Sequence, residues 1–328
     1  MAGGVFAGFA VSGVKGYRLL LHAISSAGKP TAGVVFSYRE KNAAFEEIRD
    51  LCRKHGIEFI ETSRLDRHSS LIAGRRLAAL FVAGWGYRID RSVFGLPGQG
   101  VIVFHDSLLP KYRGFAPTFW AVINGEKETG VTAFFIDDDI DTGDIISQQK
   151  VRILKDDDIN TVTEKVIRAY GSVFDRIIRL LASQRRLPRR RQDHGRATYC
   201  IWRVPEDGLI RWEKSAKEIR DLVRASQAPY YQAFTTFEGR RLFVAEAEVC
   251  TARRYVGSLP GKVESIRPGD GVYVLTGTGL LRLRRVRLEG DEEKDSWDVI
   301  KRLNTRLPDK TRRPGRERTR KKTTEERK

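Results

Sequence analysis

Residues 77–83 read Leu-Ala-Ala-Leu-Phe-Val-Ala, an apolar run with two arginines before it and a glycine after it. An unbroken run of this length predicts a strand buried on both faces, as in the parallel sheets of α/β proteins. Helical patterns alternate with further short apolar runs on both sides of it. The first part of the chain is therefore predicted to be an α/β domain with a doubly wound, mainly parallel sheet, a Rossmann-like fold.

The elements expected in this domain follow from that alternation of patterns. Strands are predicted at residues 3–9, 32–37, 58–61, 77–83, 101–105 and 130–136. Helices are predicted at residues 14–27, 43–55, 64–73, 116–124 and 161–182, and the last and longest closes the domain.

The pattern changes after a polar, arginine-rich segment that prolines interrupt. One helix at 215–225 precedes short strands separated by glycine and proline turns, which suggests a small β-barrel of the OB-like type. These strands are predicted at 233–237, 242–248, 271–276 and 281–288. We expect a first domain at 1–184, a basic linker at 185–199, a barrel-like domain at 200–310 and a basic disordered tail at 311–328.

Composition bounds the class of protein. With 328 residues, of which 41% are hydrophobic, the chain can build a core in each of two domains. Cys52, Cys200 and Cys250 are too far apart in sequence for a disulfide framework or a CxxC pair. This use of cysteine fits a protein of a reducing compartment. No apolar run approaches the roughly 20 residues that span a membrane, and no secretory leader is evident. We expect a cytoplasmic protein without a membrane partner.

The net charge of +18 is unevenly placed along the chain. More than half of the excess falls in residues 185–199 and 311–328, whereas the two expected domains are nearly balanced. A protein that grips a phosphate backbone usually carries its basic residues on a folded face. Two interpretations stay open for the basic segments: solvated flexible chain, or contacts to a polyanion such as tRNA.

Two motifs that suggest cofactors fail on inspection. Gly8, Gly13 and Gly16 fit neither the phosphate-binding loop nor the dinucleotide fingerprint. The acidic run at 137–144 resembles a calcium loop, but its glycine is in the seventh position and Gln148 stands where a bidentate carboxylate belongs. No metal site and no nucleotide cofactor are predicted.

The most informative stretch follows the expected strand at 101–105. Residues 105–117 read His-Asp-Ser-Leu-Leu-Pro-Lys-Tyr-Arg-Gly-Phe-Ala-Pro, so a histidine ends an apolar strand where ligands bind in open parallel sheets. With Gly-Val-Thr at 130–132 and Asp-Thr-Gly-Asp-Ile at 141–145, this stretch resembles the folate-dependent formyltransferases. Residues 203–212 and the following helix resemble the carboxyl-terminal domain shared by methionyl-tRNA formyltransferases and amino-sugar N-formyltransferases.

The resemblance implies transfer of a formyl group from the co-substrate 10-formyltetrahydrofolate to an amine. Attack by the amine builds a tetrahedral intermediate with an anionic oxygen, which protonated His105 would stabilise. Asp141 would hold the imidazole, favour its charged form and help to remove the proton of the amine.

Binding roles are implied by the same resemblance. The pterin is expected to lie against Gly84, Trp85, Gly86, Tyr87 and Ile89, with Asp137, Asp138, Asp139 and Ile140 closing over it. Ser107, Lys111 and Arg113 are expected to face the amine substrate.

Two positions near the predicted catalytic histidine depart from the family pattern. Val103 stands where the family places an asparagine, so one donor to the formyl oxygen is missing. Asp106 replaces the proline or glycine that usually follows the histidine. Three hypotheses follow: a slower enzyme, an enzyme whose donor comes from elsewhere, or a relative that binds folate without turnover.

Two acceptor classes are considered for an active enzyme. The stretches at 111–114, 120–126 and 205–208 look more like the sugar branch of the family, which favours the amino group of a sugar nucleotide as acceptor. Methionyl-tRNA is the alternative, and the basic linker and tail would then contact phosphates.

Overall fold

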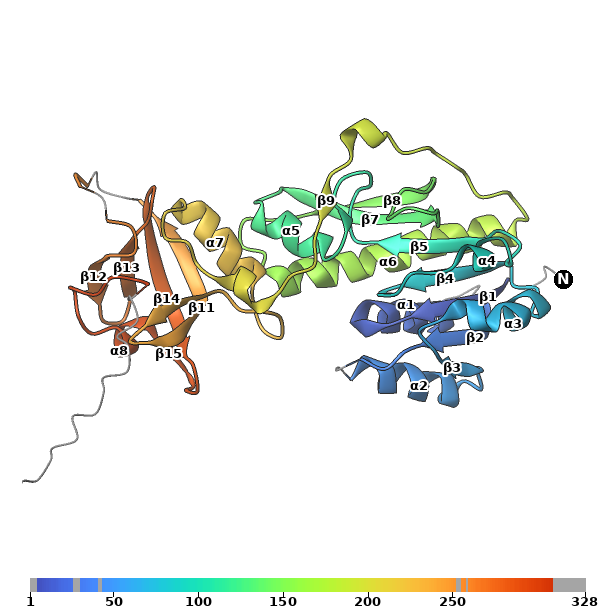
Figure 1. Ribbon diagram of the computed structural model, residues 1–328, viewed down its shortest axis with the longest axis horizontal. Coiled ribbons are helices and arrows are strands. Elements are labelled where there is room, and N and C mark those ends of the chain that lie inside the picture. Colours follow the sequence, from blue (N-terminus) through green and yellow to red (C-terminus); the bar gives the residue numbers. More distant parts are fainter. Residues whose placement is uncertain (1–4, 26–29, 41–42, 252–254, 258, 309–328) are drawn as a thin grey trace, which may run out of the picture. The chain divides into compact units, whose positions relative to one another are not determined.

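The structure is a computed structural model that describes residues 5–25, 30–40, 43–251, 255–257 and 259–308 (Figure 1). It divides into two compact units, with the boundary between Arg203 and Val204. The predicted tail at 311–328 and the ends of two predicted elements, at residues 3–4 and 26–27, lie outside the described residues.

The first unit is built on a seven-stranded sheet with the order β3-β2-β1-β4-β5-β7-β8. Its first five strands are parallel, and β7 and β8 run antiparallel to their neighbours, which confirms the mainly parallel sheet. The strands are β1 Phe6–Val11, β2 Thr31–Ser37, β3 Phe59–Glu61, β4 Ala79–Ala83, β5 Val101–His105, β7 Glu128–Phe135 and β8 Ile145–Arg152.

Helices cover both faces of this sheet, as a doubly wound fold requires. On one face, Phe174 contacts Phe9 and Phe81. On the opposite face, Leu65 and Ile72 pack against aliphatic residues of the strands. The helices are α1 Gly13–Ser25, α2 Ala44–Lys54, η1 Leu65–His68, α3 Ser69–Gly74, α4 Arg91–Phe94, α5 Pro117–Ile123 and α6 Ile159–Ala182.

The segment predicted as a linker belongs to the first unit. Arg190 and Ile145 exchange two backbone hydrogen bonds, of 2.8 and 3.0 Å. The short strand β9 (Tyr199–Cys200) pairs in parallel with β6 (Arg113–Gly114), and η2 (His194–Arg196) lies between these two contacts. The difference arises because backbone groups of this polar sequence find hydrogen-bond partners on the domain, which composition alone does not reveal.

The second unit is an antiparallel sheet with one main helix, α7 (Ala216–Ala225). Its strand order is β10-β11-β14-β13-β12, and β15 pairs with β14. The expected small β domain is thus an antiparallel sheet, in which no pairing among the described residues joins β10 to β12. The elements are η3 Pro205–Gly208, β10 Phe234–Phe237, β11 Arg240–Cys250, β12 Val263–Arg267, β13 Gly271–Leu275, β14 Leu280–Leu288, β15 Glu293–Asp295 and α8 Ser296–Val299.

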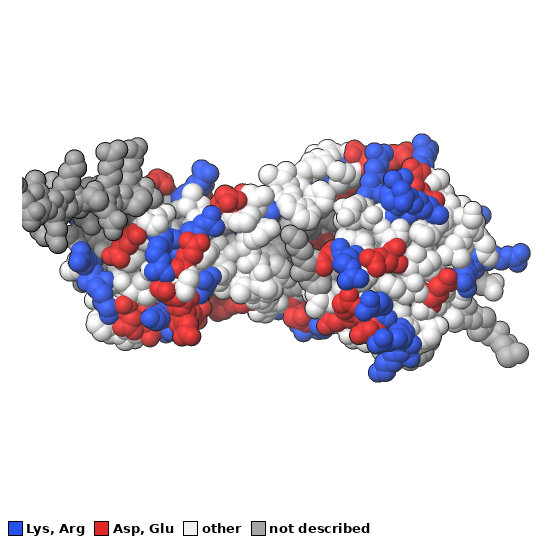
Figure 2. All heavy atoms as spheres, turned by 60° about the horizontal axis from the view of Figure 1, so that its bottom comes forward, with Lys and Arg blue, Asp and Glu red and all other residues white. Residues whose placement is uncertain are grey.

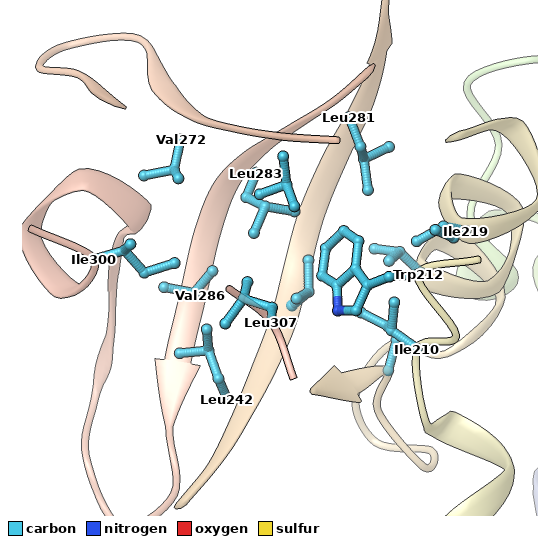
Figure 3. Close-up of a cluster of buried hydrophobic side chains, with 14 of the residues drawn as sticks. Ile210, Trp212, Ile219, Leu242, Val272, Leu281, Leu283, Val286, Ile300 and Leu307 are labelled. Carbon is cyan, nitrogen blue, oxygen red and sulfur yellow. The ribbon is translucent and has the colours of Figure 1, made fainter. Parts of the chain in front are cut away.

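Trp212 is at the centre of the second core. It is fully buried among aliphatic side chains from α7 and the strands, as Figure 3 shows. Its Nε1 donates a hydrogen bond of 3.1 Å to Thr235 Oγ1, which satisfies the one polar atom of the ring. Helix α7 begins with a capping box in which Ser215 and Glu218 bond each other's backbone N–H groups.

No helix in the described part of the chain combines the length and the apolar character needed to cross a membrane.

Candidate active site

A cavity of about 680 Å³ opens at the carboxyl edge of the first sheet. Its walls come from the ends of β4 and β5, the start of α1, the segment after β7, and Tyr170 of α6. All of its lining residues belong to the first unit. The position agrees with the rule that open parallel sheets bind ligands at the carboxyl ends of their strands.

His105 and Asp141 meet at this cavity. His105 ends β5, and its Nδ1 lies 3.5 Å from Asp141 Oδ2, with both side chains largely buried. His105 Nε2 donates to the carbonyl oxygen of Tyr112 at 2.7 Å, because a carbonyl can only accept. The nitrogen left to face a ligand is therefore Nδ1, beside the carboxylate.

The backbone around Asp141 fixes the position of its carboxylate. Asp141 has a φ of 53°, in the left-handed region that aspartate tolerates better than most residues. Its Oδ2 accepts a hydrogen bond of 2.7 Å from the Gly114 N–H. Gln192 Nε2 donates to the carbonyl oxygens of Asp141 and Gly143, each at 2.8 Å. A side chain at Gly143 would lie 1.8 Å from the Phe135 carbonyl oxygen, so this loop requires glycine there.

The three residues expected to face the amine substrate lie outside the cavity lining. Ser107 is buried and its hydroxyl donates to the Lys111 carbonyl at 2.6 Å, while the Lys111 side chain is exposed. Arg113 is fully buried, and its guanidinium donates to Gln192 Oε1 at 2.8 Å. The guanidinium therefore supports the residue that fixes the Asp141 loop and does not face a ligand in the cavity.

The segment expected to meet a pterin forms a wall of the cavity. Gly84, Trp85, Gly86, Tyr87 and Ile89 all line it. A Cβ at Gly84 would lie 2.1 Å from the Ser12 carbonyl oxygen, and its φ of +66° also requires glycine.

Tyr38, which sequence reasoning missed, stands against this wall. Its ring lies edge-on to Trp85 and Tyr87, with centroids 5.1 and 4.7 Å away, and its hydroxyl accepts from Gly86 N–H at 3.0 Å. Burial raises the pKa of Tyr38 to about 12, so the hydroxyl stays protonated at neutral pH. Trp85 Nε1 is buried without a hydrogen-bond partner among the described residues.

Residues 137–140, three aspartates and an isoleucine, also line the cavity. Asp137 and Asp139 each accept a hydrogen bond of 2.7 Å from the backbone N–H of the next residue. Arg91 lies 3.3 Å from the Asp138 carboxylate, and Ile140 is about half exposed. Among the described residues no group of three His, Cys, Asp or Glu side chains is arranged to hold a metal ion.

Val103 presents an apolar side chain to the cavity. It packs against Phe134 and Leu109 on one side and against the Leu80 and Val82 cluster on the other. Its side chain offers no hydrogen-bond donor at the position that the family resemblance assigns to asparagine.

A second charged group in the cavity was not predicted from the sequence. Lys15 of α1 forms an ion pair with Asp106, and the Tyr170 hydroxyl donates to the same carboxylate. Burial lowers the pKa of Lys15 to about 8 and raises that of Tyr170. The only sequence signal was the unusual aspartate after His105, since a buried carboxylate needs a cation or several donors.

Comparison with known proteins identifies the family of both units. Residues 31–178 match the formyl transferase family model, and residues 204–304 match the model of the formyl transferase C-terminal domain. Methionyl-tRNA formyltransferase of Anaeromyxobacter dehalogenans strain 2CP-C is 33% identical over 287 residues, which cover 85% of this chain and 91% of the relative. That of Caldanaerobacter subterraneus is 30% identical, covering 78% of this chain and 82% of the relative.

Solved structures share the fold at low sequence identity. The sugar 3N-formyl transferase WlaRD, solved in the presence of dTDP and 5-N-formyl-THF, has a TM-score of 0.60 at 16% identity, covering 88% of this chain and 99% of WlaRD. HypX from Aquifex aeolicus has a TM-score of 0.61 at 14% identity, covering 90% of this chain and 47% of HypX. From the family models and the sequence relatives, the chain belongs to the folate-dependent formyltransferase family.

Proposed function

We propose that the protein transfers the formyl group of 10-formyltetrahydrofolate to a primary amine. The observation that carries the proposal is the buried pair of His105 and Asp141, 3.5 Å apart at the edge of a cavity of about 680 Å³. An imidazole and a carboxylate in contact supply the donor and the proton acceptor that acyl transfer to an amine requires.

The wall of Trp85 and Tyr87 fits a pterin co-substrate. Flat rings pack well against aromatic side chains, and both Trp85 and Tyr87 line the cavity. One solved relative in fold, WlaRD, was crystallised with 5-N-formyl-THF, and a HypX structure holds tetrahydrofolic acid.

The amine nitrogen forms a bond to the formyl carbon, and the bond from that carbon to the folate nitrogen breaks. His105 Nδ1 donates to the oxygen that becomes anionic in the tetrahedral intermediate. Asp141 holds the ring and receives a proton from the amine, which passes to the departing folate nitrogen.

Methionyl-tRNA is the first acceptor to test. The sequence relatives named above are methionyl-tRNA formyltransferases that match this chain through both units. The basic residues of the segment 185–199 lie on the first unit and supply positive charge for phosphates.

An amino-sugar nucleotide is the second candidate. On the face that Figure 2 shows, basic and acidic side chains are intermingled. Several arginines of the second unit are also paired, such as Arg282 with Glu248 and Arg285 with Glu293. Paired arginines offer less charge to a phosphate backbone than a basic face does. This surface favours a small acceptor.

The test supplies 10-formyltetrahydrofolate together with initiator methionyl-tRNA or with a dTDP-linked 3-amino sugar. The rate of formyl transfer to each acceptor is measured from the release of tetrahydrofolate. Formylation of the tRNA with a KM that rises steeply with salt supports the first acceptor. Formylation of the sugar at a KM insensitive to salt supports the second. Tight folate binding without turnover on either amine contradicts the enzyme proposal and supports a folate-binding relative.

A further inference from the structure

A charged cluster in the cavity has no part in the formyl transfer steps given above. Lys15 Nζ pairs with Asp106 Oδ2, and the Tyr170 hydroxyl donates to Asp106 Oδ1. Thr118 Oγ1 lies 3.5 Å from the same carboxylate. Lys15, Asp106 and Tyr170 all line the cavity, and we call these three side chains the charged wall.

At the carboxyl edge of the sheet, the charged wall lies toward one face, and the wall of Trp85 proposed to bind a pterin lies toward the opposite face. Trp85 and Val103 pack against the hydrophobic cluster that includes Leu65 and Ile72, on the face of η1 and α3. Phe104 stacks on Tyr170 of α6 instead, with ring centroids 5.3 Å apart. Successive residues of a strand point to opposite faces, so a ligand on the Val103 side leaves the α6 side of the cavity for a second substrate.

We propose that Lys15, held by Asp106, binds the amine acceptor by donating a hydrogen bond to an oxygen atom near its attacking nitrogen. This inference rests on the proposed function. An ammonium group has three hydrogens and no acceptor, so its bond to Asp106 leaves further donors. The Lys15 side chain is 24% exposed and faces the cavity, whereas Asp106 and Tyr170 beneath it are buried.

The electrostatics of the pair suit such a donor. Burial lowers the pKa of Lys15 to about 8, which is still above neutral pH, and Asp106 lies beside the ammonium as its ion-pair partner. At pH 7 the side chain is therefore charged. An acceptor molecule offers oxygens to it in either class considered above: an ester carbonyl in methionyl-tRNA, hydroxyl groups in a sugar nucleotide.

The chain contains a matched pair with a structural setting. Lys165 Nζ lies 2.5 Å from Asp157 Oδ2, and the side-chain exposures are 24% and 7%, against 24% and 10% for Lys15 and Asp106. Neither Lys165 nor Asp157 lines the cavity. Removing either lysine leaves a buried carboxylate without its cation, so we expect the two variants to lose a similar amount of stability. Only removal of Lys15 is expected to weaken binding of the acceptor.

The test compares Lys15→Met with Lys165→Met in the full chain, using whichever of the two acceptors above the unaltered chain formylates. For Lys15→Met we expect the acceptor KM to rise roughly tenfold or more, the loss of one hydrogen bond to a charged group. The KM for 10-formyltetrahydrofolate stays unchanged. Lys165→Met lowers the melting temperature similarly and changes neither KM.

Each outcome decides the inference. If the unaltered chain formylates neither acceptor, the proposed function fails and this inference falls with it. If the unaltered chain is active but Lys15→Met keeps its acceptor KM, or raises both KM values equally, only the inference is overturned. Should Lys15→Met fail to fold, the double variant Lys15→Met with Asp106→Asn removes both charges and is expected to show the same selective rise. An unchanged acceptor KM in the double variant overturns the inference.

Discussion

His105 contacts two different acceptors through its two ring nitrogens. Nε2 donates to the Tyr112 carbonyl at 2.7 Å, and Nδ1 faces Asp141 at 3.5 Å. The first contact fixes the ring plane, and the second places a charged partner beside the nitrogen that reaches the cavity. A ring held on both sides has little rotational freedom left to lose when a substrate binds. This preorganisation is a large part of how a positioned donor accelerates a reaction.

Val103 offers no hydrogen-bond donor at the position where the family resemblance places an asparagine. Replacing it by asparagine supplies that donor and tests its effect. We expect Val103→Asn to raise kcat for formyl transfer, within the ~10²–10³ that one oxyanion donor typically provides. Val103→Ala is the control, since it also removes the two methyl groups of valine but adds no donor. A kcat for Val103→Asn no higher than that of Val103→Ala would show that another group already fills the role.

At the scale of elements, the segment between α6 and β9 holds the loop that carries Asp141. Gln192 lies in this segment, is buried, and connects Arg113 to the carbonyl oxygens of Asp141 and Gly143. The segment was predicted as a linker because of its composition. Its arginines and prolines look like solvated chain, and composition does not reveal which backbone groups find partners on a folded domain.

The variant Gln192→Glu tests this support. It keeps an oxygen for Arg113 but removes the amide donor to the two loop carbonyls, so the Asp141 carboxylate shifts. We expect kcat to fall roughly ten- to a hundredfold with folate affinity unchanged, as small misplacements of catalytic groups do. Gln149→Glu on β8 is the control: Gln149 is half-buried, it donates to the neighbouring Lys150 carbonyl oxygen, and its replacement should leave kcat unaltered. An unaffected kcat in Gln192→Glu contradicts the role given to this residue.

The sequence predicted the parallel part of the sheet because strands buried on both faces carry continuous apolar runs, such as 77–83. It did not predict β8, whose sequence of Ile-Ile-Ser-Gln-Gln-Lys-Val-Arg is partly polar. An edge strand with one exposed side has no such run. The pairing of Lys15 with Asp106 was missed for another reason: the two residues are 91 positions apart, and only the fold brings a cation to that carboxylate.

At the scale of the whole molecule, the cavity belongs to one unit, and the other unit has a separate core. Every residue that lines the cavity lies before residue 204, and the second unit has its own core around Trp212. We expect a chain of residues 1–203 to bind 5-formyltetrahydrofolate with the affinity of the full chain. Quenching of tryptophan fluorescence measures it, because Trp85 lies in the cavity wall. Loss of binding in a folded first unit would mean that the second unit completes the site.

The central claim is that His105 and Asp141 together carry the chemistry. Its most direct test is the single-turnover rate of formyl transfer in the unaltered chain, His105→Ala and Asp141→Ala, with folate binding measured in parallel. We predict that each variant still binds 5-formyltetrahydrofolate and that each loses at least ~10²–10³ of the rate. A variant that binds the folate and transfers the formyl group at nearly the unaltered rate would contradict the account.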